Sequence, residues 1–219
     1  MVLPNKIIIA DDHPLFRQAL LATLTEKFTN TAWFEAQTIN ELESLLSGNN
    51  DSDLLLLDLN IPGAHGFSTL IYVRKHFPQI PVVIVSAHDN QETINKAMAY
   101  GAAGFVPKST PVNEIYSAIT AVLSGEIWLP AAFTLQQSSK EVVNIADRVA
   151  SLTHQQYRIL KMFAQGMLNK QIAYSLHVSE ATIKAHATAI FKKLEVRNRT
   201  QAVISIAQLD FSESNFESK

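Results

Sequence analysis

The fold of this chain is decided by two stretches, KIIIADD at residues 6–12 and LLLLD at residues 54–58, in which a short apolar run (residues 6–10 and 54–57) is followed directly by aspartate. Neither run alternates apolar with polar residues, which is typical of parallel strands that are buried on both faces of a sheet. Three further short runs lie at residues 32–36, 81–85 and 104–106. Segments with helical spacing separate the five runs, so we predict an α/β fold with a five-stranded, doubly wound parallel sheet.

The inner faces and the ends of several helices can also be predicted. One helical face is expected to contain four apolar residues: Leu15, Ala19, Leu20 and Leu24. Gly101 follows another helical segment and is expected at its C′ position, where a left-handed backbone is common. Thr110 is expected to cap the next helix, with Pro111 at its first position. The first two of these helices lie between strands along the chain and the third follows the last strand, as the doubly wound fold requires.

The composition excludes several classes of protein. The 219 residues include no Cys, so a disulfide framework, a thiolate metal site and a Cys nucleophile are all excluded. No run approaches the about 18 apolar residues that a membrane-spanning helix needs, and the N-terminus has no signal-peptide pattern. We therefore expect a cytoplasmic protein without a membrane partner.

The formal net charge of −2 conceals an uneven distribution. Residues 1–123 carry seven basic and twelve acidic residues, a net charge of −5, whereas residues 148–209 carry nine basic and two acidic residues, a net charge of +7. Such asymmetry predicts two domains, of which the second meets an anion. Residues 124–147 are interpreted as a linker that is partly helical toward its end, and the polar tail at residues 210–219 is expected to be disordered.

The basic segment, residues 148–209, is predicted to be a small all-α domain. Thr153 and Gln156 form a capping-box pattern at the start of its first helix. A short helix follows, and a three-residue turn ending in the capping residue Ser179 leads into an amphipathic helix with a basic outer face. Two helices joined by a tight turn, the second of them basic, are typical of a helix-turn-helix. A last helix is expected over residues 199–209.

Polar side chains follow four of the predicted strands. Asp11 and Asp12 follow the first run, Asp58 the third and Ser86 the fourth, while Lys108 lies two residues beyond the fifth. The carboxyl ends of parallel strands meet at one edge of the sheet, where ligands bind in this architecture. Neighbouring carboxylates require a cation, and hard oxygen ligands suit Mg²⁺. Taken singly, each residue is explained as a helix cap or a surface charge; taken together, they predict phosphoryl transfer to a carboxylate.

These motifs resemble the receiver domain of two-component response regulators over about residues 5–123. The matching stretches are Asp11-Asp12-His13-Pro14, Asp58-Leu59-Asn60-Ile61-Pro62-Gly63 and Val106-Pro107-Lys108. The resemblance implies that Asp58 accepts a phosphoryl group from a sensor histidine kinase. It also implies a Mg²⁺ ion held by the carboxylates of Asp11, Asp12 and Asp58 and by the backbone carbonyl of Asn60.

The same resemblance implies roles for the groups around the acceptor. Lys108 would pair with the phosphoryl oxygens, and Ser86 would swing to donate a hydrogen bond to them. Phe105 occupies the aromatic switch position of the family, where Tyr is common. A Phe can rotate inward but has no hydroxyl, and a plain core role is the alternative. His88, two residues after Ser86, is expected to be an exposed loop residue, with tuning of dephosphorylation as the alternative.

The family also uses the first helix for kinase docking, which would involve Leu15, Phe16 and Ala19. A place for these three residues in the core is the alternative.

The basic segment resembles the LuxR-type DNA-binding domain over about residues 148–208. The resemblance rests on stretches that include Asn169-Lys170-Gln171-Ile172-Ala173 and Val178-Ser179-Glu180-Ala181-Thr182-Ile183-Lys184. It implies that Lys184, Ala185 and Thr188 face base edges in the major groove. It implies phosphate contacts from five further residues: Thr182, Asn169, Lys170, Lys192 and Lys193. A receiver followed by this domain is the arrangement of the NarL/FixJ subfamily, whose members bind paired half-sites of double-stranded promoter DNA as homodimers.

The chain departs from the LuxR-type pattern at three places. His154 stands where Pro is common, and Gln156 and Arg158 stand where the family usually has Glu. The capping box survives with Gln156, but any salt bridge that Glu would make within the domain is in doubt.

The favoured hypothesis is a transcription regulator whose sequence-specific DNA binding is controlled by phosphorylation at Asp58. Such a protein is not an enzyme beyond its own Mg²⁺-dependent phosphorylation and dephosphorylation. One alternative is a DNA-binding regulator that acts without phosphorylation, although all five receiver positions are intact. A less favoured alternative is an aspartyl-phosphate phosphatase, which would need a substrate pocket and a cap that the linker does not supply.

Overall fold

The computed structural model describes residues 3–131, 133, 140–207 and 209. The chain divides into two compact units, Met1–Val143 and Asn144–Lys219, which are described separately here. The tail at residues 210–219, for which disorder was expected, lies outside the described residues. No helix within the described ranges is long and apolar enough to cross a membrane.

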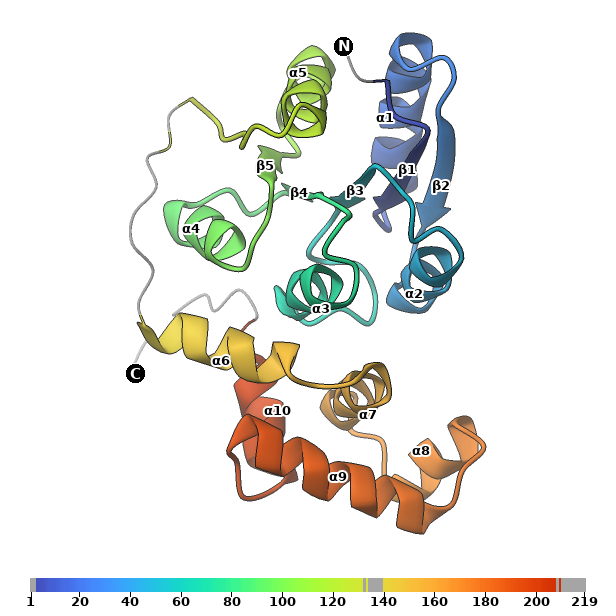
Figure 1. Ribbon diagram of the computed structural model, residues 1–219, viewed down its shortest axis with the longest axis vertical. Helices are drawn as coiled ribbons and strands as arrows, with labels where there is room; N and C mark the ends of the chain where they lie inside the picture. The colour runs from blue at the N-terminus through green and yellow to red at the C-terminus, as the bar shows by residue number, and fades with distance from the viewer. Residues whose placement is uncertain (1–2, 132, 134–139, 208, 210–219) are drawn as a thin grey trace, which may run out of the picture. The chain divides into compact units, whose positions relative to one another are not determined.

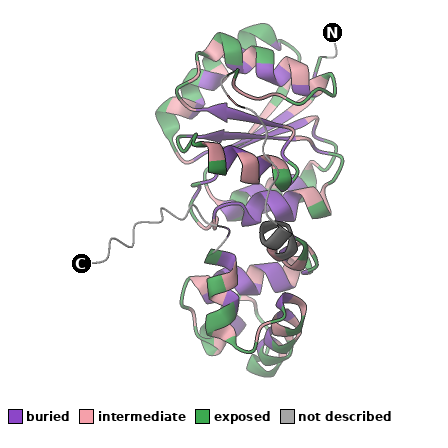
Figure 2. Cartoon of the chain, turned by 90° about the vertical axis from the view of Figure 1, so that its left-hand side faces the viewer, coloured by how far each residue is buried: buried purple, intermediate pink, exposed green. Residues whose placement is uncertain are grey.

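The first unit contains the predicted five-stranded parallel sheet. Its strands are β1 (Lys6–Ala10), β2 (Ala32–Ala36), β3 (Leu54–Leu57), β4 (Val82–Ser86) and β5 (Gly104–Pro107). The strand order is β2-β1-β3-β4-β5, and every neighbouring pair is parallel. Strands β1, β3, β4 and β5 are buried almost throughout, as Figure 2 shows in purple. The absence of polar alternation in these runs is therefore explained by helices on both faces of the sheet.

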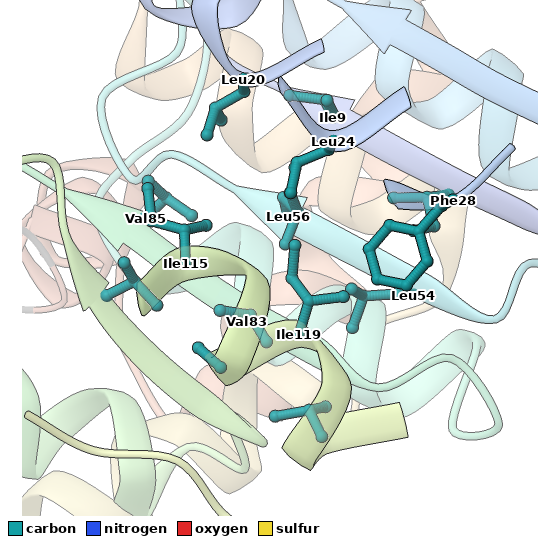
Figure 3. Close-up of a cluster of buried hydrophobic side chains, with 14 residues drawn as sticks. Ile9, Leu20, Leu24, Phe28, Leu54, Leu56, Val83, Val85, Ile115 and Ile119 are labelled. Carbon is teal, nitrogen blue, oxygen red and sulfur yellow. The ribbon is translucent and has the colours of Figure 1, made fainter. Parts of the chain in front are cut away.

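Five helices cover this sheet: α1 (Pro14–Lys27), α2 (Ile39–Gly48), α3 (Ser68–His76), α4 (Gln91–Ala99) and α5 (Val112–Leu123). Helices α1 and α5 lie on one face, and α2, α3 and α4 lie on the other (Figure 1). Between the sheet and the α1–α5 layer lies a core of 14 buried apolar residues, which includes Leu20 and Leu24 of α1, Leu54 and Leu56 of β3, and Ile119 of α5 (Figure 3). Burial of this many apolar side chains supplies the main favourable free energy of folding.

The structure tests the predicted helix details. Gly101 follows α4 with a φ of 88°, which confirms its left-handed C′ role. The prediction for Thr110 is wrong: Pro111 takes the N-cap position, without a side-chain cap, and α5 begins at Val112. The predicted inner face of α1 is also partly wrong, because Leu15 is 83% exposed and Ala19 is exposed.

The chain beyond α5 returns to the edge of the sheet. Trp128 donates its backbone N–H to the carbonyl of Ala103 at 3.2 Å, and its carbonyl accepts from the N–H of Phe105 at 3.0 Å. The partly buried indole of Trp128 packs against the core. Gly104 permits this approach, because a Cβ there would lie 3.2 Å from the Trp128 carbonyl oxygen. The beginning of the segment interpreted as a linker is therefore attached to β5.

The second unit is helical, as predicted. Its helices are α7 (His154–Ala164), α8 (Asn169–Ser175), α9 (Glu180–Leu194) and α10 (Arg199–Ala207), preceded by α6 (Lys140–Ala150), whose first residues belong to the other unit. Helices α7, α8 and α10 pack against α9. The side chains of Ile183, Ile190 and Leu194 on α9 are almost completely buried. This burial explains why one stripe of α9 is apolar while its remaining surface is polar.

Local sequence signals determine how these helices begin and end. Thr153 and Gln156 form the predicted capping box of α7. Ser179 caps α9 by accepting a hydrogen bond from the N–H of Thr182. His177, in the turn before it, has a φ of 53°, a left-handed conformation that lets a short turn join α8 to α9. The helix-turn-helix prediction is therefore confirmed.

Candidate functional sites

The predicted acidic site forms at the carboxyl edge of the sheet. Asp11 and Asp58 follow β1 and β3, which are neighbours in the sheet, and both side chains are at most 2% exposed. The ammonium of Lys108 lies between them, with Nζ 2.8 Å from Asp11 Oδ2 and 2.8 Å from Asp58 Oδ2. Three residues from distant parts of the sequence thus form one buried charged cluster.

Backbone hydrogen bonds hold these residues in place. The N–H of Asp58 donates to the carbonyl of Ala10 at 2.8 Å, which continues the β1–β3 pairing as far as the acidic residues. The N–H of Lys108 donates to the carbonyl of Ser86 at 2.8 Å, which does the same for β4 and β5. The N–H of Asn60 donates to Asp58 Oδ1 at 3.1 Å. The sheet itself therefore sets the separation of the cluster's members.

The electrostatics of the cluster keep Lys108 charged. Burial alone would lower the pKa of Lys108, but the interactions of its ammonium with Asp11 and Asp58 outweigh burial and raise this pKa above its ordinary value. The ammonium also lies 5.1 Å from the centre of the Phe16 ring, within cation–π range. A lysine that stays charged at neutral pH beside two buried carboxylates is suited to binding an anion that replaces one of them.

The cluster also has the donor set of a divalent-cation site. Asp11, Asp12, His13 and Asp58 each offer a ligand atom, and these atoms lie within 4.8 Å of one another. Asp11 Oδ2 and Asp12 Oδ1 are both buried; Lys108 Nζ lies 2.8 Å from the first, and His13 Nδ1 lies 2.8 Å from the second. Three carboxylates this close together repel one another unless positive charge lies among them. A divalent cation would satisfy both oxygens, so these residues fit the ion that the acidic pattern predicts.

Of the two predicted switch residues, Ser86 contacts Lys108 through its backbone carbonyl, and Phe105 lies on β5 three residues before Lys108. Ser86 is fully buried at the end of β4, and its Oγ accepts a hydrogen bond from the N–H of His88 at 3.1 Å. Phe105 is also fully buried, and it follows Gly104, the β5 residue that bridges to Trp128. His88 is exposed, as expected, and its Nδ1 lies 3.3 Å from Asn60 Nδ2. Ser86 and Phe105 thus come from the adjacent strands β4 and β5, and Lys108 directly follows β5.

Two residues near the site were missed by the sequence reasoning. His13 has its Nδ1 2.8 Å from Asp12 Oδ1 and 3.2 Å from Asp11 Oδ1. Arg17 is buried and donates to the backbone carbonyl of Asp11 at 2.7 Å. The available signal for Arg17 was its spacing, since it lies three residues before the buried Leu20 and so shares the inner face of α1.

The outer face of α9 is the candidate nucleic-acid interface. Lys184, Ala185 and Thr188 are all exposed on it, as is Lys192. Lys184 makes an ion pair with Glu180 at 3.2 Å, and its side chain is 66% exposed. Thr182, in the first turn of α9, is half-buried. The predicted base-reading residues therefore share one accessible surface near the N-terminal half of the helix, which is the part that contacts bases in helix-turn-helix proteins.

The remaining predicted phosphate contacts separate into two groups. Asn169 and Lys170 lie at the first turn of α8, where Lys170 is exposed and Asn169 is half-buried. Lys193 differs, because its ammonium donates to the Ser151 carbonyl at 2.7 Å and to Gln156 Oε1 at 2.8 Å. Lys193 therefore joins α9 to the start of α7. At position 156 the Gln accepts a hydrogen bond from Lys193, where a Glu would make a salt bridge.

Arg199 makes a similar intradomain contact at the other end of α7. Its guanidinium lies 4.4 Å from the centre of the Phe163 ring and donates to the carbonyls of Phe163 and Met167 at 3.1 and 2.6 Å. Burial lowers the pKa of Arg199 from its ordinary value. The cation thereby ties the start of α10 to the end of α7 and to the loop that follows it.

Comparisons with known proteins identify the families of the two units. Residues 7–120 match the response regulator receiver domain, and residues 150–206 match the bacterial regulatory proteins of the luxR family. A glycerol metabolism activator of Pseudomonas putida is 41% identical over 214 residues, which cover 94% of this chain and 97% of that protein. The nitrate/nitrite response regulator protein NarL of Escherichia coli K12 is 32% identical over 212 residues, covering 94% and 96% of the two chains.

Solved structures have the same architecture. A LuxR family DNA-binding response regulator from Silicibacter pomeroyi has 30% sequence identity and a TM-score of 0.52, covering 58% of this chain and 98% of that one. The two-component response regulator RcsB, in a complex with DNA, has 23% identity and a TM-score of 0.52, and covers 94% of this chain and 96% of that one, which supports the fold.

A receiver fold with an intact acidic site, joined to a helix-turn-helix domain, defines a two-component response regulator that acts on transcription. The chain belongs to the NarL/FixJ type of this family, in which the output domain is of the LuxR type.

Proposed function

We propose that Asp58 accepts a phosphoryl group from a sensor histidine kinase, and that this modification controls sequence-specific DNA binding by α9. The observation that carries the proposal is the buried Asp58 carboxylate, held 2.8 Å from Lys108 Nζ beside the carboxylates of Asp11 and Asp12. A nucleophile, a fixed cation and a set of cation ligands are the parts that phosphoryl transfer requires.

The reaction is a displacement at phosphorus. A carboxylate oxygen of Asp58 forms a bond to the phosphorus of a phosphohistidine, and the P–N bond breaks with its electron pair going to the departing imidazole. Lys108 moves from the Asp58 carboxylate to a phosphoryl oxygen, which it can do because its ammonium stays protonated. Hydrolysis by water returns the carboxylate and releases inorganic phosphate, so the chain turns over only its own modification.

Mg²⁺ is the cation proposed for this site. Asp11, Asp12 and Asp58 would hold it through their carboxylates, together with the backbone carbonyl of Asn60. When bound, the ion supplies positive charge that offsets the charge on the carboxylates and the incoming phosphoryl oxygens. Its place is supported by the ligand atoms of Asp11, Asp12 and Asp58, which all lie within 4.8 Å of one another.

Phosphorylation would be sensed by the residues at the ends of β4 and β5. The new group carries about −1.5 to −2 charge and strong acceptor oxygens. The Ser86 hydroxyl would turn from its place near the His88 N–H to donate to one of these oxygens. The Phe105 ring would then rotate inward, into the space beside the displaced Ser86 hydroxyl. Because Phe105 has no hydroxyl, any signal it transmits must come from packing or from its own backbone.

The output would be binding of a homodimer to paired half-sites on double-stranded DNA in the cytoplasm. Lys184, Ala185 and Thr188 would read base edges, and Thr182, Asn169, Lys170 and Lys192 would contact phosphates. The two binding events reinforce each other because the second occurs at a high effective concentration. Support comes from the exposure of these side chains on α8 and α9 and from the net charge of the segment.

We also propose the domain limits that the charge distribution indicates: a receiver at residues 1–123, a linker at 124–147, and a DNA-binding domain at 148–209 before the tail. The compact division after Val143 supports a boundary near the end of the proposed linker, whereas the hydrogen bonds of Trp128 attach its beginning to the receiver unit.

The proposal is tested by DNA footprinting of the full chain with and without beryllofluoride, a phosphoryl mimic. We expect beryllofluoride with Mg²⁺ to tighten binding of the wild type and to leave Asp58→Asn unchanged. Incorporation of phosphate from acetyl phosphate should likewise be lost in Asp58→Asn. Equal binding and equal activation by the two proteins would favour a regulator that acts without phosphorylation, and turnover of a small phosphate ester would favour a phosphatase.

A further inference from the structure

Arg17 is a buried cation that lies behind the acidic cluster rather than in it. Its residue is 5% exposed, on the inner face of α1. Its Nε donates to Glu35 Oε2 at 2.7 Å, and its Nη1 donates to the backbone carbonyl of Asp11 at 2.7 Å. One guanidinium therefore joins α1, strand β2 and the loop that begins with Asp11.

These contacts fix the Asp11 backbone from two sides. The N–H of Asp11 donates to the carbonyl of Ala36 on β2 at 3.0 Å, while Arg17 binds the Asp11 carbonyl. The Asp11 carboxylate is then held by the N–H of His13, which donates to Oδ1 at 2.7 Å. Oδ2 pairs with the ammonium of Lys108 at 2.8 Å.

The chemistry of arginine suits this task. Its planar guanidinium donates in fixed directions, so Nε and Nη1 can bind two acceptors at a set angle, whereas a lysine ammonium is a point charge on a flexible stem. Burying such a cation is costly unless it is paired and hydrogen-bonded. Glu35, whose side chain is 44% exposed, supplies the pairing charge from the solvent side.

We propose that Arg17 is a positioning residue for the divalent-cation site: it holds the Asp11 carbonyl and thereby aims the Asp11 carboxylate at the cation, with Glu35 orienting the guanidinium. This inference rests on the proposed Mg²⁺ site and deepens it. Groups behind metal ligands commonly change metal affinity by about 10- to 100-fold when they are removed.

The sign of the effect separates positioning from simple electrostatics. A positive charge near the site repels a divalent cation, so removing it by Arg17→Met should tighten Mg²⁺ binding if charge alone matters. If Arg17 acts by positioning, the same substitution weakens Mg²⁺ binding. Arg17→Lys keeps the charge, so electrostatics predicts no change, while positioning predicts a loss because the second directed hydrogen bond is gone.

The test is calorimetric titration of the full-length chain with MgCl₂, followed by beryllofluoride at saturating Mg²⁺. We expect Arg17→Met to weaken Mg²⁺ affinity about 10-fold or more, with a smaller loss in Arg17→Lys. Lys27→Met is the matched control, because it removes a positive charge from an exposed position at the last residue of the same helix. It should bind Mg²⁺ as the wild type does.

The outcomes distinguish the two levels of the proposal. If Arg17→Lys, which retains the buried charge and so the fold, binds Mg²⁺ as tightly as the wild type, the positioning role is overturned. Tighter binding by Arg17→Met would overturn it as well. If the wild type itself binds no Mg²⁺, the proposed cation site fails together with this inference.

Discussion

The acidic edge of the receiver sheet and the outer face of α9 are opposite kinds of functional site. In the first, Asp11 and Asp58 are at most 2% exposed, and Lys108 holds both before any ligand arrives. In the second, Lys184 is 66% exposed and belongs to a row of accessible side chains. The first site is preorganised by its surroundings, whereas the second acquires its geometry from the partner that it meets.

The difference has a physical cause in the chemistry of the two ligands. Transfer of a small phosphoryl group is accelerated by charges fixed in a poorly hydrated site, where electrostatic interactions are strong. DNA is a large polyanion, whose binding is driven by many exposed cations that release counterions. Substitutions should therefore change folding and chemistry together at the first site, and should change affinity with little effect on folding at the second.

The largest effect is expected for Lys108→Met. It leaves two buried carboxylates without their cation, which should lower the free energy of unfolding by about 3 kcal/mol in metal-free buffer and abolish the response to beryllofluoride. Added Mg²⁺ should recover part of the stability. Lys96→Met is a matched control, since the Lys96 side chain is equally 14% exposed but pairs with a single carboxylate, that of Glu92, which is 67% exposed.

The raised pKa of Lys108 also predicts how the stability difference between the wild type and Lys108→Met depends on pH. The pKa of Lys108 is raised in the folded state, so its stabilising contribution is complete below the ordinary lysine pKa and is lost only as pH rises through the raised value. The difference in unfolding free energy between wild type and Lys108→Met should thus be constant from neutral pH to the ordinary lysine pKa. Equal denaturant stability of the two proteins would mean that the acidic site is not preorganised by Lys108.

A second effect, comparable in stability but confined to the helical unit, compares the two faces of α9. Ile190 is fully buried, so Ile190→Ala should cost about 2–5 kcal/mol in the unfolding of the second unit. Thr188→Ala, two residues away on the exposed face, should change stability by less than about 0.5 kcal/mol and should weaken DNA binding instead. Denaturant unfolding and DNA titration of both variants provide the measurement. A large loss of stability in Thr188→Ala would show that the outer face also supports the fold.

The smallest expected effect distinguishes the roles of two adjacent lysines on α9, Lys192 and Lys193. Lys192→Ala should weaken binding to all DNA sequences and reduce the slope of log affinity against log salt by about 1. Lys193→Ala should leave that slope unchanged and lower stability by about 1 kcal/mol, because its hydrogen bonds to Ser151 and Gln156 are lost. DNA affinity measured at several salt concentrations distinguishes them, and equal slopes for the two variants would assign Lys193 to the DNA interface after all.

Much of the fold and the acidic site could be predicted because the signals are local. The runs that became β1, β2 and β3 were predicted with their observed limits, and β4 is shifted by one residue. The prediction that Asp11, Asp58 and Lys108 meet required only the rule that parallel strands end at one edge. Thr110 failed as a cap because Pro111 occupies that position instead.

Predictions that depended on packing direction were less successful. Leu15 and Ala19 have helical spacing with Leu20 and Leu24, but α1 presents Arg17 to the interior and leaves Leu15 in solvent. For Lys193 the structure adds a contact that spacing did not predict, a hydrogen bond to Gln156 within the domain, and its phosphate contact stays a prediction. Side-chain spacing defines the faces of a helix but does not say which partner each face will meet.

The order of residues alone therefore dictates the two folds, the acidic cluster and the basic recognition helix, because each depends on periodicity, strand ends and capping residues that are close in the sequence. Only the tertiary structure decides that Arg17 reaches the Asp11 carbonyl, that Trp128 joins β5 beside Phe105, and that Lys193 serves α7. Each of these contacts joins residues whose meeting depends on how whole elements pack. Packing is settled by the combined burial of many side chains rather than by a local pattern.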